Sequence, residues 1–402
     1  MGAVDRTRAK TRARATTGSG SGAGSGGPAG ANLGVVRSHN TALVLGLLRD
    51  AGAGGISRLE LAERTGLTPQ AVSKITARLR EQGLAAEAGR RASTGGKPRT
   101  VLRLVPDAGH AVGVHLDRDE LRVVLVDLDG TVVGERRAAL DLGAGAEAVL
   151  GAVVGAVEGV VHDGLGPGAE GLTGAGAPAG AGTLLGVGVA LPGPLDHARG
   201  VLHRVTGFPE WDGFPLRDAL GERLRVPVVV DKDTNAAALG LSAGGEGGSF
   251  AYLHLGTGLG AGLVIGGRVH RGARTGAGEF GHQVIQLDGP LCECGNRGCV
   301  EVLCLAAVAR GENGEAARVL GVGAGNLVGL LDIDVVLLGG RTVAGAPGVF
   351  AGGVREVLDA WARRAGVLGG TVPVRVAPGG ERVVAEGAAQ LLLGPLFGRG
   401  DA

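Results

Sequence analysis

The spacing of hydrophobic positions changes at about residue 106 and divides the chain into two parts. Before that point, residues 41–49 and 68–82 place apolar side chains at helical spacing. After it, runs such as AVGVHL (111–116) and VPVVV (226–230) predict β-strands that alternate with helical stretches. The pattern therefore predicts a small, largely helical domain followed by a larger α/β region.

Two helix starts in the first part carry clear signals. Ser57 and Glu60 have the spacing of a capping box in front of an apolar run. After a turn at Gly66, Thr68 and Pro69 provide an N-cap and a proline at the first helical position. Two short helices joined by a tight turn are typical of a helix-turn-helix unit.

The second of these helices has a polar outer face, and a basic glycine-rich tip follows it. Residues 84–86 and 100–105 are predicted strands on either side of GRRASTGGKPR (89–99), which makes the unit a winged helix-turn-helix. We expect the helix face to contact the major groove of DNA and the wing to contact phosphates or the minor groove. The predicted DNA-binding residues are Gln70, Ser73, Lys74, Arg78, Arg90, Arg91, Lys97 and Arg99. The alternative is a small helical protein-interaction domain with solvated charges.

Charge is distributed unevenly along the chain, and this supports the DNA-binding interpretation. Residues 1–105 hold 17 Lys and Arg against 6 Asp and Glu, whereas the rest holds 23 against 33. A basic first quarter is suited to a polyanion. Residues 1–34 are basic and Gly/Ser-rich, so we expect a disordered tail, followed by the DNA-binding domain at 35–106 and a sensor domain at 107–402. Within the sensor, residues 163–183 are expected to form a mobile, glycine-rich surface loop.

The chain shows no secretory signal and no uninterrupted apolar run of about 18 residues. We therefore expect a cytoplasmic protein with no membrane partner, in which cysteines stay reduced.

Three of the four cysteines lie in LCECGNRGCVE (291–301). His282, Cys292, Cys294 and Cys299 would supply one nitrogen and three sulfurs, a set that Zn²⁺ accepts in closed, structural sites. The alternative is a group of free buried thiols. Cys304 lies beyond the motif in an apolar stretch and is expected to be a core residue.

This cysteine motif stands in a longer series that resembles a known family. GTGLGAGLVIGG (256–267), GAGEFGH (276–282) and CECGNRGCVE (292–301) are flanked by DKDTNAAALG (231–240) and VVLLGG (335–340). The series resembles the ROK family of sugar kinases and sugar-responsive repressors, from about residue 40 onward. The resemblance implies a two-lobed, actin-like ATPase or sugar-kinase fold (ribonuclease H-like). The N-terminal winged helix is similar to that of the repressor branch, of the xylose and N-acetylglucosamine type.

The resemblance also implies roles for particular residues. It assigns Glu279 and Glu301 to sugar hydroxyls and lets His282 serve both the sugar and the zinc. Asp233 matches the general base of family kinases and is expected to bind sugar here. The preceding residue, an asparagine in the family, is Lys232, which could face the cleft or solvent. Asn235 is expected to order the start of its helix.

Two departures from the family pattern bear on activity. Family kinases carry Asp-x-Gly-Gly-Thr for ATP phosphates, whereas this chain has His115, Leu116, Asp117, Arg118 and Asp119. Carboxylates and side chains at this place would repel phosphate and prevent its close approach. A second phosphate-like loop remains at Gly256, Thr257, Gly258 and Gly260, although a tight turn alone explains it. The segment at 302–334 is shorter than in the family, which puts the local fold and the dimer contacts in question.

The sequence thus favours a sugar-responsive transcriptional regulator, a repressor of carbohydrate uptake or metabolism genes, with structural Zn²⁺ and without ATP. Its expected partners are a double-stranded DNA operator and a sugar or sugar phosphate, and its expected assembly is a homodimer or a dimer of dimers. The alternative is an active ROK-type sugar kinase with a DNA-binding appendage. A DNA-binding scaffold that senses no ligand is a third possibility.

Overall fold

The computed structural model describes residues 39–91, 99–166, 183–203, 205, 208–365 and 371–399. The predicted tail at 1–34, Lys97, the side chain of Arg91 and residues 167–182 of the predicted loop lie outside this description. The start of that loop was placed too early, because helix α4 (Ala146–Leu165) continues through residues 163–165.

The N-terminal domain, over residues 39–91 and 99–105, has three α-helices and a small antiparallel sheet. Its helices are α1 (His39–Asp50), α2 (Arg58–Thr65) and α3 (Pro69–Glu81). Its strands are β1 (Ile56–Ser57), β2 (Ala85–Arg91) and β3 (Arg99–Leu104), in the order β1-β3-β2. The capping box is confirmed, since Ser57 Oγ accepts from the amide of Glu60 and the Glu60 carboxylate accepts from the amide of Ser57. Thr68 likewise caps α3 at the amide of Ala71.

The first lobe of the sensor is a five-stranded mixed sheet. Its strands are β4 (Gly109–Leu116), β5 (Glu120–Asp127), β6 (Val132–Ala139), β7 (Thr183–Leu191) and β10 (Val228–Lys232), in the order β10-β7-β4-β5-β6. Strands β4, β7 and β10 are parallel, while β5 and β6 extend the sheet as antiparallel neighbours. A small hairpin, β8 (Leu195–Asp196) and β9 (Val201–Leu202), follows β7.

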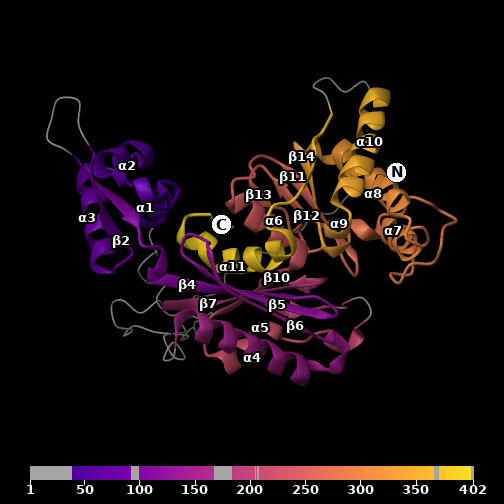
Figure 1. Cartoon of the computed structure of the whole chain (residues 1–402), viewed down its shortest axis with the longest axis horizontal. Helices are drawn as coiled ribbons and strands as arrows, with labels where there is room; N and C mark the ends of the chain where they lie inside the picture. The colour runs from indigo at the N-terminus through magenta and orange to yellow at the C-terminus, as the bar shows by residue number, and fades with distance from the viewer. Residues whose placement is uncertain are drawn as a thin grey trace, which may run out of the picture. The chain divides into compact units, whose positions relative to one another are not determined.

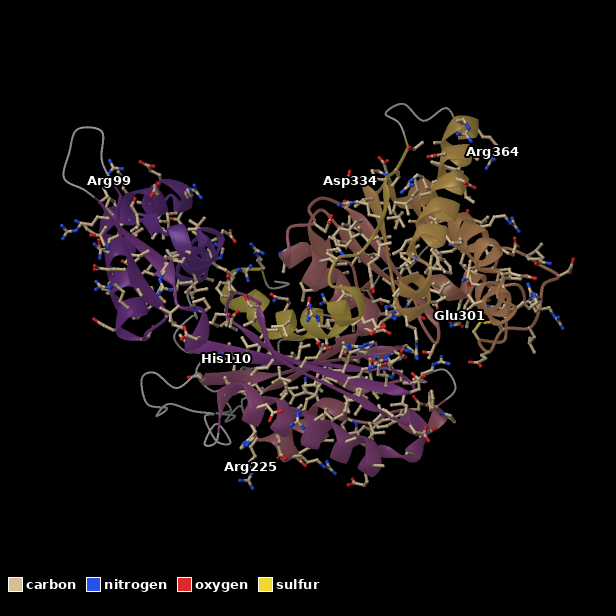
Figure 2. The ribbon with its side chains drawn as sticks, viewed as in Figure 1. Arg99, His110, Arg225, Glu301, Asp334 and Arg364 are labelled. Carbon is tan, nitrogen blue, oxygen red and sulfur yellow. The ribbon has the colours of Figure 1, made fainter. Side chains whose placement is uncertain are left out.

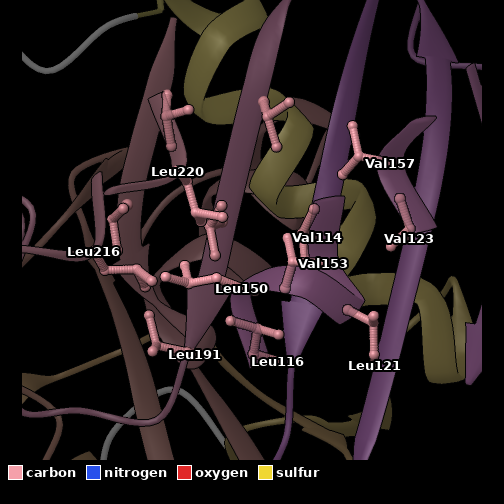
Figure 3. Packing of buried hydrophobic residues seen from close by; sticks show 14 of the residues in the cluster. Val114, Leu116, Leu121, Val123, Leu150, Val153, Val157, Leu191, Leu216 and Leu220 are labelled. Carbon is pink, nitrogen blue, oxygen red and sulfur yellow. The ribbon is translucent and has the colours of Figure 1, made fainter. Parts of the chain in front are cut away.

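Helices α4 and α5 (Leu216–Leu224) bury one face of this sheet (Figure 3). Val114 and Leu121 of the strands pack there with Leu150 and Val153 of α4. In the described part of the chain, α4 is the one helix long and apolar enough to span a membrane by length and composition, which the sequence analysis did not anticipate. Its valine and leucine stripe is buried against the sheet, as in a core helix.

The second lobe is another five-stranded sheet with its own core. Its strands are β11 (Phe250–Leu255), β12 (Leu259–Ile265), β13 (Arg268–Val269), β14 (Val335–Gly339) and β15 (Val374–Val376), in the order β13-β12-β11-β14-β15. Its helices are α7 (Val300–Ala309), α8 (Asn313–Leu331), α9 (Arg341–Gly345) and α10 (Pro347–Ala365). The short 302–334 segment is thus accommodated by α7 and α8, which pack with α10 around a continuous apolar core.

Two further helices, α6 (Asp233–Ala243) and α11 (Val383–Leu396), lie between the two sheets (Figure 1). Helix α6 packs on β11 and β12, whereas α11 packs on β4 and β7. Glycines permit this close packing: a Cβ at Gly113 or Gly188 would overlap carbonyl oxygens of α11. The predicted fold, a winged helix-turn-helix followed by two α/β lobes, is confirmed.

Candidate functional site

A cleft between the lobes gathers residues from the ends of several elements. It encloses about 620 Å³ of space free of protein atoms, counted to its open mouth. The β4–β5 turn and the end of β7 line it from the first lobe, and the start of α6, the β11–β12 turn and the start of α7 line it from the other side. All four predicted sugar-binding residues lie on its wall: Asp233, Glu279, His282 and Glu301.

Asp233 is the first residue of α6, where the helix dipole favours a negative charge. Its Oδ1 accepts a hydrogen bond of 2.6 Å from the amide of Thr234. Burial raises the pKa of Asp233, although the nearby His254 opposes the shift. The carboxyl group can therefore accept a hydroxyl proton more readily than a solvated aspartate can.

Lys232 points to the cleft rather than to solvent. Its Nζ lies 2.6 Å from Oε1 of Glu279 and 3.0 Å from the carbonyl oxygen of Ala277. The Lys232 side chain is 5% exposed, against 42% for Glu279. Lys232 therefore fixes one oxygen of the predicted sugar acceptor and compensates its charge. Asn235 donates to Asp231 at 3.0 Å and orders the start of α6, as predicted.

Glu301 connects the cleft to the cysteine loop. It lies in the first turn of α7, and its Oε2 accepts from the amide of Leu259 at 2.8 Å. Its other oxygen lies 3.8 Å from Nδ1 of His282. The hydrogen bond to Leu259 fixes the carboxylate against the end of the β11–β12 turn.

The predicted metal ligands converge at one point. The ligand atoms of His282, Cys292, Cys294 and Cys299 all lie within 4.8 Å of one another. Cys294 Sγ lies 3.7 Å from Cys299 Sγ, and Cys292 Sγ lies 3.7 Å from His282 Nδ1. A tetrahedral zinc with Zn–S bonds of about 2.3 Å would place its sulfurs roughly 3.8 Å apart. The donor set and its spacing therefore fit Zn²⁺.

An ion-pair network joins the β4–β5 turn to the start of α9. Oδ2 of Asp117 and Oδ2 of Asp119 each lie 2.9 Å from the guanidinium of Arg341, at the start of α9. Asp117 also accepts from Oγ1 of Thr257 at 2.8 Å, so the retained glycine loop is bound to this network. Both carboxylates thus have a cationic partner within the protein.

His115 lies in β4, one residue before the end of the strand. Burial, together with the neighbouring His254, lowers the pKa of His115 to about 3. The imidazole is therefore neutral at physiological pH. Its Nε2 has no hydrogen-bond partner among the described residues.

The predicted DNA-binding face is exposed on α3. Gln70, Ser73 and Lys74 are exposed, as is Arg78, whose Nη2 also donates to Thr41 of α1 at 2.7 Å. Arg90 and Arg99 lie on the two strands that lead into and out of the wing, and Figure 2 labels Arg99. The polar face and the base of the wing thus belong to one small domain.

Sequence reasoning missed Arg341 and left the direction of the Lys232 side chain open. Arg341 follows the VVLLGG strand, but no local pattern connects it with Asp117 and Asp119. Lys232 was recognised as a departure, but its pairing with Glu279 depends on a loop 47 residues away.

Comparison with known proteins agrees with this architecture. The ROK family profile matches residues 175–310, and a profile for winged helix-turn-helix DNA-binding domains matches residues 40–85. A xylose repressor of Caldicellulosiruptor bescii is 31% identical over 270 residues, which cover 66% of this chain and 64% of the repressor. An N-acetylglucosamine repressor of Escherichia coli is 31% identical over 282 residues, covering 68% and 64%. The matched region thus spans less than two thirds of the length of these repressors.

Solved structures show the same relationship. A ROK family transcriptional regulator, homologous to the MLC protein of E. coli, matches 90% of this chain and 98% of its own with a TM-score of 0.69; at 20% identity it supports the fold alone. A ROK hexokinase from Thermus thermophilus is 30% identical and matches 70% of this chain and 96% of the hexokinase, with a TM-score of 0.55. With that identity over almost the whole hexokinase, and with the cysteine loop and cleft described above, this chain belongs to the ROK family.

Proposed function

We propose that this protein is a sugar-responsive transcriptional regulator, a repressor of carbohydrate uptake or metabolism genes that acts in the cytoplasm. One observation carries the proposal: the cleft is lined by the carboxylates of Asp233, Glu279 and Glu301, while Asp117 and Asp119 of the β4–β5 turn are paired with Arg341 of the protein itself. The winged helix-turn-helix would provide the DNA binding that the sugar controls. The names of the similar repressors, for xylose and N-acetylglucosamine, support the same function.

A sugar would be recognised by acceptors in fixed positions. Asp233, Glu279 and Glu301 present carboxylate oxygens from three different elements, and charge-assisted hydrogen bonds to hydroxyls are directional. A stereoisomer with one hydroxyl misplaced would leave a carboxylate oxygen unpaired in the cleft, at a large cost in affinity. Lys232 and the amide of Leu259 hold two of these carboxylates in place before the sugar arrives.

Zinc would act as a structural centre. His282, Cys292, Cys294 and Cys299 would hold it with no open position, and the bound metal would clamp the loop that carries His282 to the start of α7. His282 would then be fixed in tautomer and orientation beside Glu301, which lies within 3.8 Å of its Nδ1.

Sugar phosphorylation is the second candidate activity, and the ion-pair network argues against it. A nucleotide phosphate would have to displace Arg341 from Asp117 and Asp119. Two unit charges about 4 Å apart interact by roughly 4 kcal/mol at an effective dielectric constant of 20, so freed carboxylates would repel phosphate appreciably. An ATP-consumption assay across common hexoses tests this point. Turnover of about 1–100 s⁻¹, the range of ordinary kinases, would establish the kinase instead.

On the DNA side, the polar face of α3 would enter the major groove and the wing would contact the backbone. A homodimer, or a dimer of dimers, would place two such units on a palindromic operator. Half-sites about 34–36 Å apart, or multiples of this distance, require the two recognition helices to keep a matching separation. A small change in the geometry of the dimer is enough to weaken simultaneous docking.

The decisive experiment joins the two halves of the proposal. Sugars and sugar phosphates are first screened for thermal stabilisation, since a ligand that binds the native state raises the midpoint. Operator affinity is then titrated with and without the sugar found, for the wild type and for Asp233→Ala. We expect the sugar to lower wild-type affinity and to leave the variant unchanged. An unchanged wild-type affinity would reject the regulator, and a variant that responds normally would reject the assigned cleft.

A further inference from the structure

We propose that Arg399 couples closure of the sugar cleft to the DNA-binding domain by binding the end of α6 and the end of α1 at the same time. The inference rests on the proposed function and names the route by which the same cleft controls DNA binding.

Helix α6 connects the two places that must communicate. It begins at Asp233 in the cleft and ends at Ala243. At 1.5 Å per residue, its 11 residues span roughly 16 Å. The backbone carbonyl oxygen of Ala243, at the far end, accepts a hydrogen bond of 2.7 Å from Nη1 of Arg399. A rigid helix therefore links a sugar-binding carboxylate to Arg399.

The contact between α6 and α11 has the form of a pivot. The two helices cross at glycines: a Cβ on Gly240 would lie 2.8 Å from the Cα of Gly387, and a Cβ on Gly387 would overlap the carbonyl oxygen of Ala236. Two helices whose backbones are this close can rotate about their contact, but they cannot move apart without losing close packing. The contact lies between Asp233 and Ala243, so a tilt of α6 that moves one end toward the first lobe moves the other end away from it.

The DNA-binding domain is attached to the other side of this pivot. Leu45 and Leu48 of α1 belong to the same buried cluster as Leu396 and Phe397, at the end of α11. The guanidinium of Arg49 lies 4.2 Å from the centre of the Phe397 ring. Apolar packing thus holds α1 against the end of α11. Arg399, by contrast, contacts α6, the helix that packs on the sheet of the second lobe, by its hydrogen bond to Ala243.

Arg399 completes the connection at α1. Its Nη2 lies 2.9 Å from Oδ1 of Asp50, the last residue of α1. One guanidinium therefore holds a backbone carbonyl of α6 and a carboxylate of the DNA-binding domain. When a sugar draws the start of α6 toward the first lobe, the Ala243 end moves outward, and Arg399 must release Ala243 or pull on Asp50.

The structure also provides space for this movement. A cavity of about 1110 Å³, counted to its open mouth as for the cleft, lies where α1, the β5–β6 turn, the end of α6 and α11 meet. Gln390 of α11 lines it, and its buried Oε1 has no hydrogen-bond partner among the described residues. The end of α6 is therefore not packed tightly on this side, in contrast to its middle.

The test compares Arg399→Ala with Arg375→Ala in the full-length protein. Arg375 is a matched control: it pairs with Glu246 at 2.7 Å, just beyond the end of α6, and among the described residues it forms no ion pair with the DNA-binding domain. Operator Kd is measured by fluorescence anisotropy with and without the sugar found by the stability screen. The sugar-induced shift in thermal midpoint is measured on the same samples.

We expect Arg399→Ala to keep the sugar-induced thermal shift and to bind operator without sugar within about threefold of the wild type. The change in operator Kd on adding sugar should fall by about threefold or more, in keeping with the modest strength of a half-exposed ion pair. Arg375→Ala should respond like the wild type. Asp50→Ala, which removes only the α1 side of the contact, should repeat the loss and serves if Arg399→Ala does not fold.

An Arg399→Ala protein that responds like the wild type would overturn the inference while leaving the proposed function intact. Equal losses in Arg399→Ala and Arg375→Ala would also overturn it, because the end of α6 would then be sensitive to any change. If the wild-type protein itself shows no response to sugar, the proposed function fails, and the coupling fails with it.

Discussion

The ion pair between Lys232 and Glu279 gives a stability prediction whose sign follows from unequal burial. The ammonium group is nearly buried and the carboxylate is half-exposed, at 5% and 42% exposure. Glu279→Gln would leave the buried cation with the Ala277 carbonyl oxygen at 3.0 Å but without its paired carboxylate. Lys232→Met would instead leave a carboxylate that water can reach. Glu279→Gln should therefore lower the free energy of unfolding more than Lys232→Met does.

The magnitudes follow from the same two exposures. Removing a charged hydrogen-bond partner costs about 1.5–3 kcal/mol, and breaking a fully buried pair costs about 3–5 kcal/mol. Because Glu279 is partly solvated, we expect the lower range, about 2 kcal/mol, for Glu279→Gln. Lys232→Met should cost about 0–1 kcal/mol, the range of exposed pairs, since methionine fills the space of the buried stem. The difference corresponds to a few degrees in thermal midpoint.

The assay is thermal unfolding without ligand, at equal zinc content. The two tryptophans report on different lobes, since Trp211 lies in the core of the first and Trp361 packs against the core of the second. Glu312→Gln is the control, because the pair of Glu312 with Arg310 is half-exposed on both sides and should show no measurable effect. Equal costs for the two cleft variants, or a larger cost for Lys232→Met, would refute the reasoning.

Three further predictions concern metal, DNA and pH. Purified protein should contain about one zinc per chain. Cys294→Ser should lose the zinc and the sugar response but keep part of the DNA binding. Wild-type protein purified without zinc would contradict the assigned metal site. Arg90→Ala should weaken binding to all DNA sequences and reduce the salt dependence of the affinity, whereas Gln70→Ala should change the preferred sequence. If the affinity of Arg90→Ala depends on salt as that of the wild type does, the wing assignment is wrong. Burial raises the folded-state pKa of Asp233, so its ionisation costs folding free energy at neutral pH. Asp233→Asn should therefore raise the thermal midpoint at pH 7, and the gain should disappear below the unfolded pKa of about 3.9; a lower midpoint at pH 7 would contradict it.

Features set by neighbouring residues were predictable from the sequence. The capping box at Ser57 and the proline start of α3 depend on residues within one helical turn, and both appear as predicted. The metal cluster is nearly as local, because three of its ligands lie within eight positions. Here the chemistry of side chains at short spacing is almost sufficient to define the geometry.

Features that depend on the meeting of distant segments were not predictable. Arg341 pairs with Asp119 across 222 positions, and Arg399 pairs with Asp50 across 349. Neither arginine lies in a motif, and hydrophobic periodicity carries no information about which charges will meet. The 302–334 segment is a similar case, since α7 packs on α8 and α8 packs on α10, with no local signal for either contact.

If the protein is the regulator proposed above, the network around Arg341 affects what controls closure of the cleft. Asp117 and Asp119 belong to the first lobe and Arg341 to the second, so their ion pairs join the lobes from within the protein. In a nucleotide-dependent enzyme, a bound phosphate can supply the charge that brings two lobes together, and closure then depends on two ligands. An internal arginine makes that contribution permanent. A ligand shifts the equilibrium between the open and closed cleft only by its difference in affinity for the two states. Here that equilibrium would depend on sugar and not on nucleotide. A sensor of one sugar, insensitive to the nucleotide level of the cell, requires this property.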